Sequence, residues 1–370
     1  MSEYQYYEFQ AIDRPLTRDE QAALRACSSR ARISATHFVN EYHWGDLKGN
    51  PMEWMQKYFD AHLYLSSFGS RSLVFRFPLA WIDPEWIRPY EVEGALESRE
   101  TPSHLILSFA LDEESGEYDD EEDGPGILSS LLAIRTALAN GDTRALYLGW
   151  LSAVQHGLVD GDTEEPPVPP GLGAEDSALE CLADFLHVTE DLLKAAAKLS
   201  SAPTPKPAAS EVAGWLASLS PTEKDRWLSR ILLEEDSSAI LEIRRLFLAS
   251  SRPSEKEHRR TRSVDQLLAE AGDIERQRLD QERKDAAEAR QTHLRSLIGQ
   301  ESGLWQSVIK LSESSSERYQ DNSVRILTDL RDLASLLGTT GEFQEKLEGL
   351  IELRRRKSAY MKRLEQAGFR

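Results

Sequence analysis

The stretch YQYYEFQAI at residues 4–12 alternates apolar and polar side chains, and Thr17-Arg-Asp-Glu20 follows it closely. Tyr7 and Phe9 fall on one side of an extended chain, as expected for a half-buried strand. Thr17 and Glu20 can satisfy each other's backbone amides in a capping box, which predicts that a helix begins here. A strand followed directly by a helix indicates a mixed fold.

The same mixture continues to residue 111. Alternating apolar residues over 36–44, 72–77 and 104–111 predict three further strands, with helices and an irregular connection between them. The predicted fold class is therefore α+β. We expect a small N-terminal α/β sandwich with helices on one face of a sheet, for which a ferredoxin-like arrangement is one candidate topology.

A helix is predicted after the second strand. Asn50 followed by Pro51 is typical of an N-cap and the first helical residue. Apolar residues at helical spacing continue to Leu63, and Gly69 is expected to end the helix. The Asp60-Ala-His62 sequence would then lie on a helix flank, where a catalytic histidine is less common than a structural one.

Four segments are expected along the chain. Residues 1–111 form the α/β domain, and 112–126 form an acidic connector with nine acids and no base. That connector lacks the spacing of a calcium-binding loop, so it is either a solvated linker or a docking segment for a basic partner. Residues 127–250 form a helical domain with Pro-rich linkers, and 251–370 form a charged helical C-terminal region.

A long charged helix is predicted from Val264 to Ile298. Its apolar stripe fails at Arg278, whereas a coiled coil needs three or four uninterrupted heptads. We therefore expect a single long helix, and the sequence leaves open whether it forms a coiled coil or packs on the N-terminal domain.

The chain has 370 residues and a net charge of −19, distributed unevenly. Residues 1–111 contribute −4, residues 112–250 contribute −17, and residues 251–370 contribute +2. The acidic middle would repel phosphates, which argues against a protein that wraps nucleic acid. No apolar run reaches the roughly 18 residues of a membrane span, and two distant cysteines fit a reducing compartment. We expect a cytoplasmic protein without a membrane partner.

No motif commits the chain to a chemical reaction. Phosphate-binding loops, dinucleotide fingerprints and hydrolase or metalloprotease motifs are missing, so we predict no catalytic residue and no cofactor. His37, Glu41 and His43 share one side of a predicted strand and could bind a metal, but six extended residues separate the histidines by roughly 20 Å. Cys27 and Cys181 lack a neighbouring base and are expected to be structural thiols.

Two parts of the chain resemble known sequences. The tail resembles a helical segment of uncharacterised bacterial proteins, some of which carry a SWIM zinc finger. The residues that carry the resemblance are Asp329-Leu-Arg-Asp-Leu-Ala334, Phe343 to Leu347, Arg356-Lys357 and the terminal Arg363-Leu-Glu-Gln-Ala-Gly-Phe369. The opening residues 4–17 resemble the start of an uncharacterised bacterial family. A SWIM finger needs three cysteines and a histidine, so the resemblance implies a bacterial helical module without a zinc site.

Basic residues suggest where phosphate could be contacted. The candidates are Arg259, Arg260, Arg354, Arg355, Arg356 and Lys357. Interleaved acids and the lack of an aromatic stacking platform favour solvated helix faces instead.

The predicted function is that of a non-enzymatic bacterial adaptor or scaffold in a multi-component system, in defence or regulation. Its partners would be one or more bacterial proteins. Trp81, Trp86 and Trp150 are candidate interface anchors, because aromatic residues dominate interface hot spots, although burial in the core is an equal alternative. The second hypothesis is a nucleic-acid-associated regulatory or accessory factor that uses the basic C-terminal helices.

Overall fold

The computed structural model describes residues 4–112, 124–203, 207–232, 238–251 and 262–369. Its contacts divide the chain into two compact units, Met1–Glu275 and Arg276–Arg370. Each unit has its own hydrophobic core, so we describe them separately.

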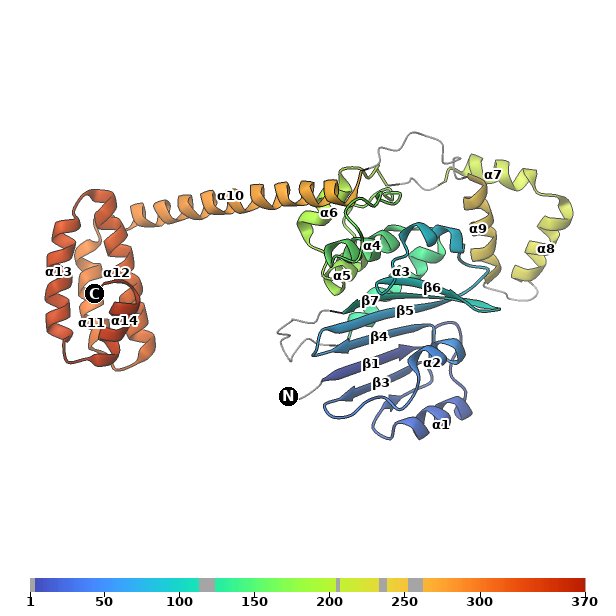
Figure 1. Cartoon of the computed structure of the whole chain (residues 1–370), viewed down its shortest axis with the longest axis horizontal. Helices are drawn as coiled ribbons and strands as arrows, with labels where there is room; N and C mark the ends of the chain where they lie inside the picture. The colour runs from blue at the N-terminus through green and yellow to red at the C-terminus, as the bar shows by residue number, and fades with distance from the viewer. Residues whose placement is uncertain (1–3, 113–123, 204–206, 233–237, 252–261, 370) are drawn as a thin grey trace. The chain divides into compact units, whose positions relative to one another are not determined.

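The first unit is built on one seven-stranded sheet (Figure 1). Its strands are β1 (Gln5–Gln10), β2 (Arg32–Ile33), β3 (His37–Tyr42), β4 (Ala61–Ser66), β5 (Ser70–Pro78), β6 (Leu96–Glu100) and β7 (His104–Asp112), in the order β2-β3-β1-β4-β5-β7-β6. Every neighbouring pair is antiparallel. The α+β class is confirmed. The ferredoxin-like candidate is present within this sheet, because β1-α1-β2-β3-α2-β4 forms two split βαβ units with the antiparallel order β4-β1-β3-β2. Strands β5, β7 and β6 extend that arrangement to seven strands.

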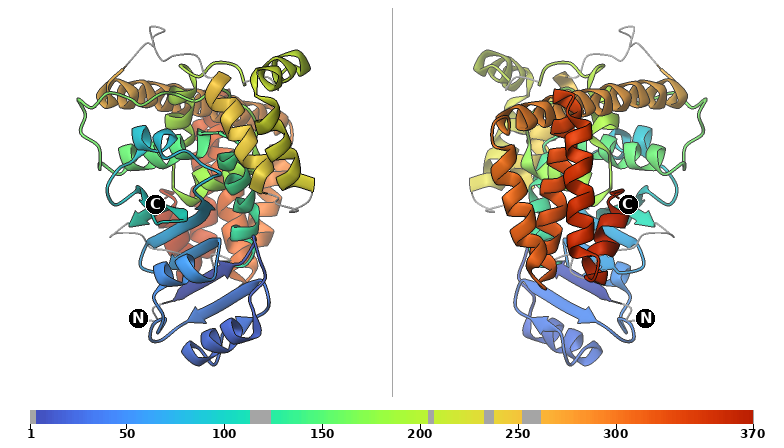
Figure 2. Two further views of the ribbon diagram at one scale, coloured as in Figure 1. Left: turned by 90° about the vertical axis from the view of Figure 1, so that its right-hand side faces the viewer. Right: turned by 90° about the vertical axis from the view of Figure 1, so that its left-hand side faces the viewer.

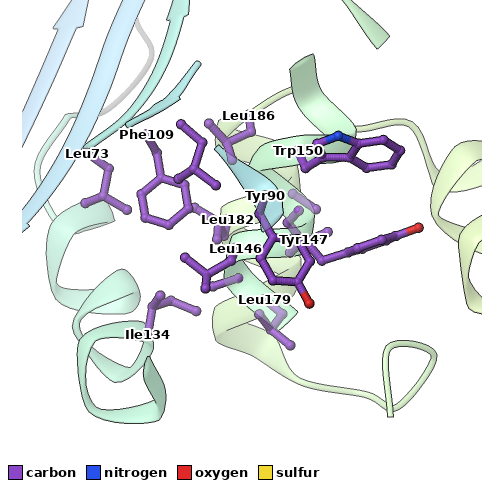
Figure 3. Packing of buried hydrophobic residues seen from close by; sticks show 14 of the residues in the cluster. Leu73, Tyr90, Phe109, Ile134, Leu146, Tyr147, Trp150, Leu179, Leu182 and Leu186 are labelled. Carbon is purple, nitrogen blue, oxygen red and sulfur yellow. The ribbon is translucent and has the colours of Figure 1, made fainter. Parts of the chain in front are cut away.

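One face of the sheet carries most of the helices. These are α3 (Ile127–Ala139), α4 (Arg144–Gln155), α5 (Ser177–Phe185) and α6 (Glu190–Ala197). Alternation along β7 directs Leu105, Leu107 and Phe109 toward them, where they form one core with residues such as Leu146 and Trp150 (Figure 3). The helical segment after residue 126 is therefore part of the same unit as the sheet, because it covers that sheet's apolar face.

The opposite face is covered at one end only. Helices α1 (Arg18–Cys27) and α2 (Pro51–Lys57) pack there over Phe9, Phe38 and Val74. Figure 1 shows both helices at the far end of the strands from the N-terminus. The two helices of residues 1–111 thus lie on one face of the sheet, as expected, and the helices that cover the other face come from beyond residue 126.

Local signals placed the starts of these helices. The capping box is present, since the Glu20 amide donates to Thr17 Oγ1 and the Thr17 amide donates to Glu20 Oε2. Asn50 Oδ1 accepts from the amides of Met52 and Glu53 at the start of α2. Both predicted helix starts are confirmed.

The predicted end of the second helix is wrong. Helix α2 ends at Lys57, and β4 begins at Ala61. Ala61, Leu63 and Leu65 face the large core through the two-residue period of a strand. Leu63 fits both a helical and a strand repeat, and pairing with β1 and β5 decides between them.

A chain segment after α6 forms three helices, α7 (Ala209–Ser218), α8 (Pro221–Leu232) and α9 (Ser238–Ser251). A second capping box begins α8, with the Glu223 amide donating to Ser220 Oγ and the Ser220 amide donating to Glu223 Oε2. Two short 3-10 turns, η1 (Pro84–Trp86) and η2 (Arg88–Tyr90), lie between β5 and β6.

A buried ion pair holds the start of α10 (Val264–Ser296) against the first unit. Arg262 Nε donates to Glu165 Oε2 over 2.6 Å, and Arg262 Nη1 donates to the Ala195 carbonyl over 3.0 Å. The Tyr147 hydroxyl donates to the same Glu165 carboxylate. Burial raises the pKa of Tyr147, and the Glu165 carboxylate adds to the effect. Arg262 thereby ties three separate chain segments together.

The second unit is a helical bundle in which the four helices α11–α14 lie side by side (Figure 2). They are α11 (Glu301–Glu313), α12 (Glu317–Leu337), α13 (Thr340–Arg354) and α14 (Ser358–Gln366). Their core gathers Trp305, Leu327, Leu347 and Tyr360, and the Tyr360 hydroxyl lies 2.8 Å from Ser323 Oγ.

The two units do not coincide with the four predicted segments. Residues 1–111 and 127–250 share one core, and the boundary between units falls inside α10 rather than at residue 250. Within the described residues, no helix is both long enough and apolar enough to cross a membrane.

Candidate functional site

Two features of the first unit bring side chains from distant segments together. One is a buried ion network, and the other is an exposed aromatic end of the sheet. The network is a cluster of titratable groups, which is the kind of feature that can carry chemistry.

The network centres on Asp60, which is fully buried. Its Oδ1 accepts from Arg76 Nη2 over 2.6 Å, and its Oδ2 accepts from the backbone amides of Ile12 and Asp13. Burial opposes ionisation of Asp60, but the amide bonds and the Arg76 charge outweigh it and lower its pKa. Arg135 of α3 makes a bidentate pair with Asp13 and also donates to the Arg76 carbonyl.

This network is a structural tie. Each carboxylate accepts from an arginine, and the Arg135 guanidinium also lies 5.4 Å above the Phe77 ring and 5.2 Å from the Trp81 ring. Its groups therefore engage one another and are not directed at a cleft. The network joins β1, β5 and α3, which fixes the helices on the sheet.

The sequence candidates for metal or nucleophilic chemistry are not brought together. His37 contacts Thr36, Glu41 pairs with Arg32, and the His43 ring packs 5.4 Å from Tyr4. In the part of the chain that the structure describes, no group of three His, Cys, Asp or Glu side chains could hold a metal ion.

The cysteines are half-buried beside the two cores of the first unit. Cys27 packs against the core under α1 and α2, and Cys181 against the large core. Burial raises the pKa of the Cys181 thiol, which makes it a weaker nucleophile at neutral pH.

The free edges of the sheet are occupied by local hydrogen bonds. On β3, the Glu41 amide donates to Asn40 Oδ1 over 3.1 Å. On β6, the Leu96 amide donates to the Val92 carbonyl and the Ser98 amide donates to Glu91 Oε1. A partner strand would have to displace these bonds, so strand addition is not the mode of binding that this sheet favours.

The second feature lies on the face that α1 and α2 cover only in part. Cross-strand pairs run from Asn40 through Tyr7, Tyr64 and Ser72 to Ala110, so these residues form one row across the face. Between this row and the strand ends, Gln5 is buried, and the side chains around it remain half-buried or exposed. We call this surface the open end and define it as Tyr42, Trp44, Asp46, Tyr64, Ser66, Phe68, Ser70, Ser72 and Asp112.

Trp44 is the most exposed large apolar side chain of the open end, with 79% of its surface accessible. Phe68, in the turn between β4 and β5, is 49% accessible. Gln5 pairs with Tyr42 on one side and Ser66 on the other, so these two residues lie about 10 Å apart, two strand spacings. The two exposed aromatic residues follow just beyond those pairs.

The loop that carries Trp44 is held in place from β1. Gln5 Nε2 donates to the Gly45 carbonyl over 3.2 Å, and the Tyr7 hydroxyl donates to Asp46 Oδ1 over 2.8 Å. Gly45 adopts φ +85°, a left-handed conformation that glycine takes without strain. Trp44 is therefore displayed on a fixed turn.

The open end is polar and acidic beneath its aromatic rim. The Tyr64 hydroxyl donates to Gln5 Oε1 over 3.0 Å. Burial raises the pKa of Tyr64, and the carboxylates of Asp46 and Asp112 add to the rise. Both carboxylates therefore act on one hydroxyl at the centre of this surface.

The predicted interface tryptophans are placed differently. Trp86 and Trp150 are buried in the large core, 7% and 3% accessible, so core packing is the alternative that the structure supports for both (Figure 3). Trp81 is half-buried against the same core and lies 5.2 Å from Arg135. None of the three is an exposed anchor in this unit.

The C-terminal basic run is divided between two roles. Arg354 donates to Ser312 Oγ and the Ile309 carbonyl, and Lys357 donates to the Ser312 carbonyl at the end of α11. Cations at this position offset the negative end of a helix dipole. Arg355 and Arg356 remain exposed, and phosphate contact by them stays a prediction. Arg259 and Arg260 lie outside the described residues.

Trp44 was not among the candidates that the sequence suggested. Its signal was the Trp-Gly-Asp sequence at residues 44–46, where the predicted strand over 36–44 ends. An aromatic residue beside a left-handed glycine sits in a turn, where no helix is available to cover it.

No protein-family model, no curated protein and no solved structure matches the chain. The resemblance of the tail and of residues 4–17 to bacterial proteins therefore stays a prediction.

Proposed function

We propose that this protein is a non-enzymatic adaptor that binds another protein through the open end of its sheet. The observation that carries the proposal is the 79% exposure of Trp44 on a turn fixed by Gln5 and Tyr7. Tryptophan and tyrosine dominate interface hot spots, and a side chain that is already fixed loses little conformational entropy on binding.

Two further observations support binding rather than catalysis. The charged groups of the network around Asp60 pair with one another. The backbone amides at the free strand edges donate to nearby side chains. An aromatic contact surface is then the feature through which the first unit can select a partner. The cytoplasm of a bacterium, and a multi-component system for defence or regulation, are the setting proposed for that partner.

Affinity capture from source cells tests the proposal. The full chain, the Trp44→Ala/Phe68→Ala variant and a Leu353→Ala control would be used in parallel, since Leu353 is 60% exposed in the second unit. We expect at least one protein to bind the wild type and the control and to be lost with the double variant. Its purified form should bind the double variant at least about tenfold more weakly. If every captured protein also binds the double variant, the proposal fails.

A further inference from the structure

The acidic floor of the open end indicates which kind of partner segment fits there. Asp46 is exposed and its Oδ1 already accepts from Tyr7 and the Leu47 amide. Asp112 is exposed at the end of β7, in the row of Ser70. Among the described residues, neither carboxylate forms an ion pair with a base. Two carboxylates without a counter-ion thus flank the half-buried Tyr64.

The aromatic residues at the edge of the open end, Trp44 among them, also attract cations. The faces of tryptophan and tyrosine rings carry negative potential and attract guanidinium and ammonium groups, with tryptophan the strongest. The Trp44 turn borders the same face as Tyr64, because the Tyr7 hydroxyl on that face donates to Asp46 of the turn. A net charge of −19 also steers basic partners toward the chain from a distance.

Small side chains form the floor between these groups. Ser66, Ser70, Ser72 and Ala110 are half-buried, and none extends far above the sheet. The Ser66 hydroxyl is engaged with the backbone of Ser70, to which it donates over 2.8 Å. The surface is consequently shallow, and it suits an extended peptide better than a bulky folded element.

We propose that the open end binds an extended segment rich in arginine or lysine, with one cationic side chain at Asp46 and the Trp44 loop and another at Asp112. This inference rests on the proposed function and names the chemistry of the partner. A charge-assisted hydrogen bond to Asp46 and a cation–π contact with Trp44 can act on one group, and Asp112 attracts a second basic side chain of the same segment. Raised salt weakens such binding because the site is open to solvent.

The test uses the full chain labelled with 15N at its tryptophans, whose eight indole signals include one that disappears in Trp44→Phe. A heptapeptide of alternating glycine and arginine is titrated, and peptides with glutamate or leucine in place of arginine serve as controls. We expect the Trp44 signal to shift saturably with the arginine peptide only. Asp46→Asn and Asp112→Asn should each weaken binding roughly fivefold. Asp19→Asn, an exposed acid on α1, should not.

The inference is overturned if the leucine peptide shifts the Trp44 signal equally, or if the double variant Asp46→Asn/Asp112→Asn binds the arginine peptide as well as the wild type does. A shift of other tryptophans alone would also contradict it. Failure here leaves the adaptor proposal standing if capture still depends on Trp44 and Phe68. Loss of that dependence would reject the adaptor proposal whatever the peptides do.

Discussion

The two ends of one sheet face differ in how far their side chains are buried. The closed end, which we define as Phe9, Phe38, Trp54, Phe59, His62, Val74 and Ile106, is buried between the sheet and the α1 and α2 segments. At the open end, the same strands present tyrosines, serines and carboxylates to solvent, with Trp44 at the rim. Ten residues separate the buried Trp54 from the exposed Trp44. Burial of the closed end stabilises the fold, whereas the exposed side chains of the open end are accessible to a partner.

The ion network beside the closed end should show the largest stability effect. Asp60→Asn leaves the buried Arg76 without its counter-ion, so we expect the free energy of unfolding to fall by about 3–5 kcal/mol. Urea unfolding of the full chain measures it. Glu41→Gln, which breaks the exposed pair with Arg32, is the control and should cost less than about 1 kcal/mol. Equal losses would show that Asp60 is not a buried tie.

The two tryptophans test the comparison directly. Trp54 is 6% accessible and packs so closely that a Cβ on Gly49 would clash with its ring. Trp54→Ala should lower the free energy of unfolding by about 3–5 kcal/mol through the cavity it creates. Trp44→Ala should change it by less than about 0.5 kcal/mol, because the side chain already lies in solvent. A destabilised Trp44→Ala variant would mean that Trp44 is a folding residue and would remove the support for the interaction surface.

Acid should lower the free energy of unfolding, because the buried His62 does not take up a proton in the folded chain. Its ring stacks 3.9 Å from Phe9, its Nδ1 lies 3.0 Å from the Glu8 carbonyl, and burial lowers its pKa to about 4. The unfolded chain takes up a proton near pH 6.5 while the folded chain does not, so stability falls as the pH drops from 6.5 toward 4. The loss should reach roughly 3 kcal/mol.

His62→Phe is the matching variant, because a phenyl ring can keep the stacking contact but cannot take up a proton. The difference in unfolding free energy between wild type and variant should therefore decline over that pH range. A constant difference would show that His62 does not carry the effect.

The smallest effect is expected at the turn of the open end. An added Cβ on Gly45 meets nothing within 4 Å, so Gly45→Ala costs only the strain of φ +85°, about 1 kcal/mol. We also expect binding of the arginine peptide to weaken, since Trp44 would lose its fixed position. Gly303→Ala within α11 has equal space and should instead stabilise by about 0.5–1 kcal/mol. Unchanged peptide binding by Gly45→Ala would show that preorganisation of the loop is unimportant.

Local sequence determined much of the fold. The capping boxes at Thr17 and Ser220 and the N-cap at Asn50 mark three helix starts, because each is completed by residues within three positions. Alternation located β1, β3, β5 and β7 for the same reason, since a strand's two faces are visible in its own residues. The α+β class follows from these signals alone.

Tertiary structure alone decided the rest. Leu63 satisfies both a helical and a strand period, and only neighbouring strands made its segment β4. Trp44, Trp86 and Trp150 are alike in sequence, and their burial depends on whether a distant helix lies over them. Asp46 and Asp112 are 66 positions apart and lie on one face of the sheet only through strand pairing. The hydrophobic pattern shows which side chains are stabilised by burial. The helix or strand that covers them comes from elsewhere in the chain, so the pattern does not show it.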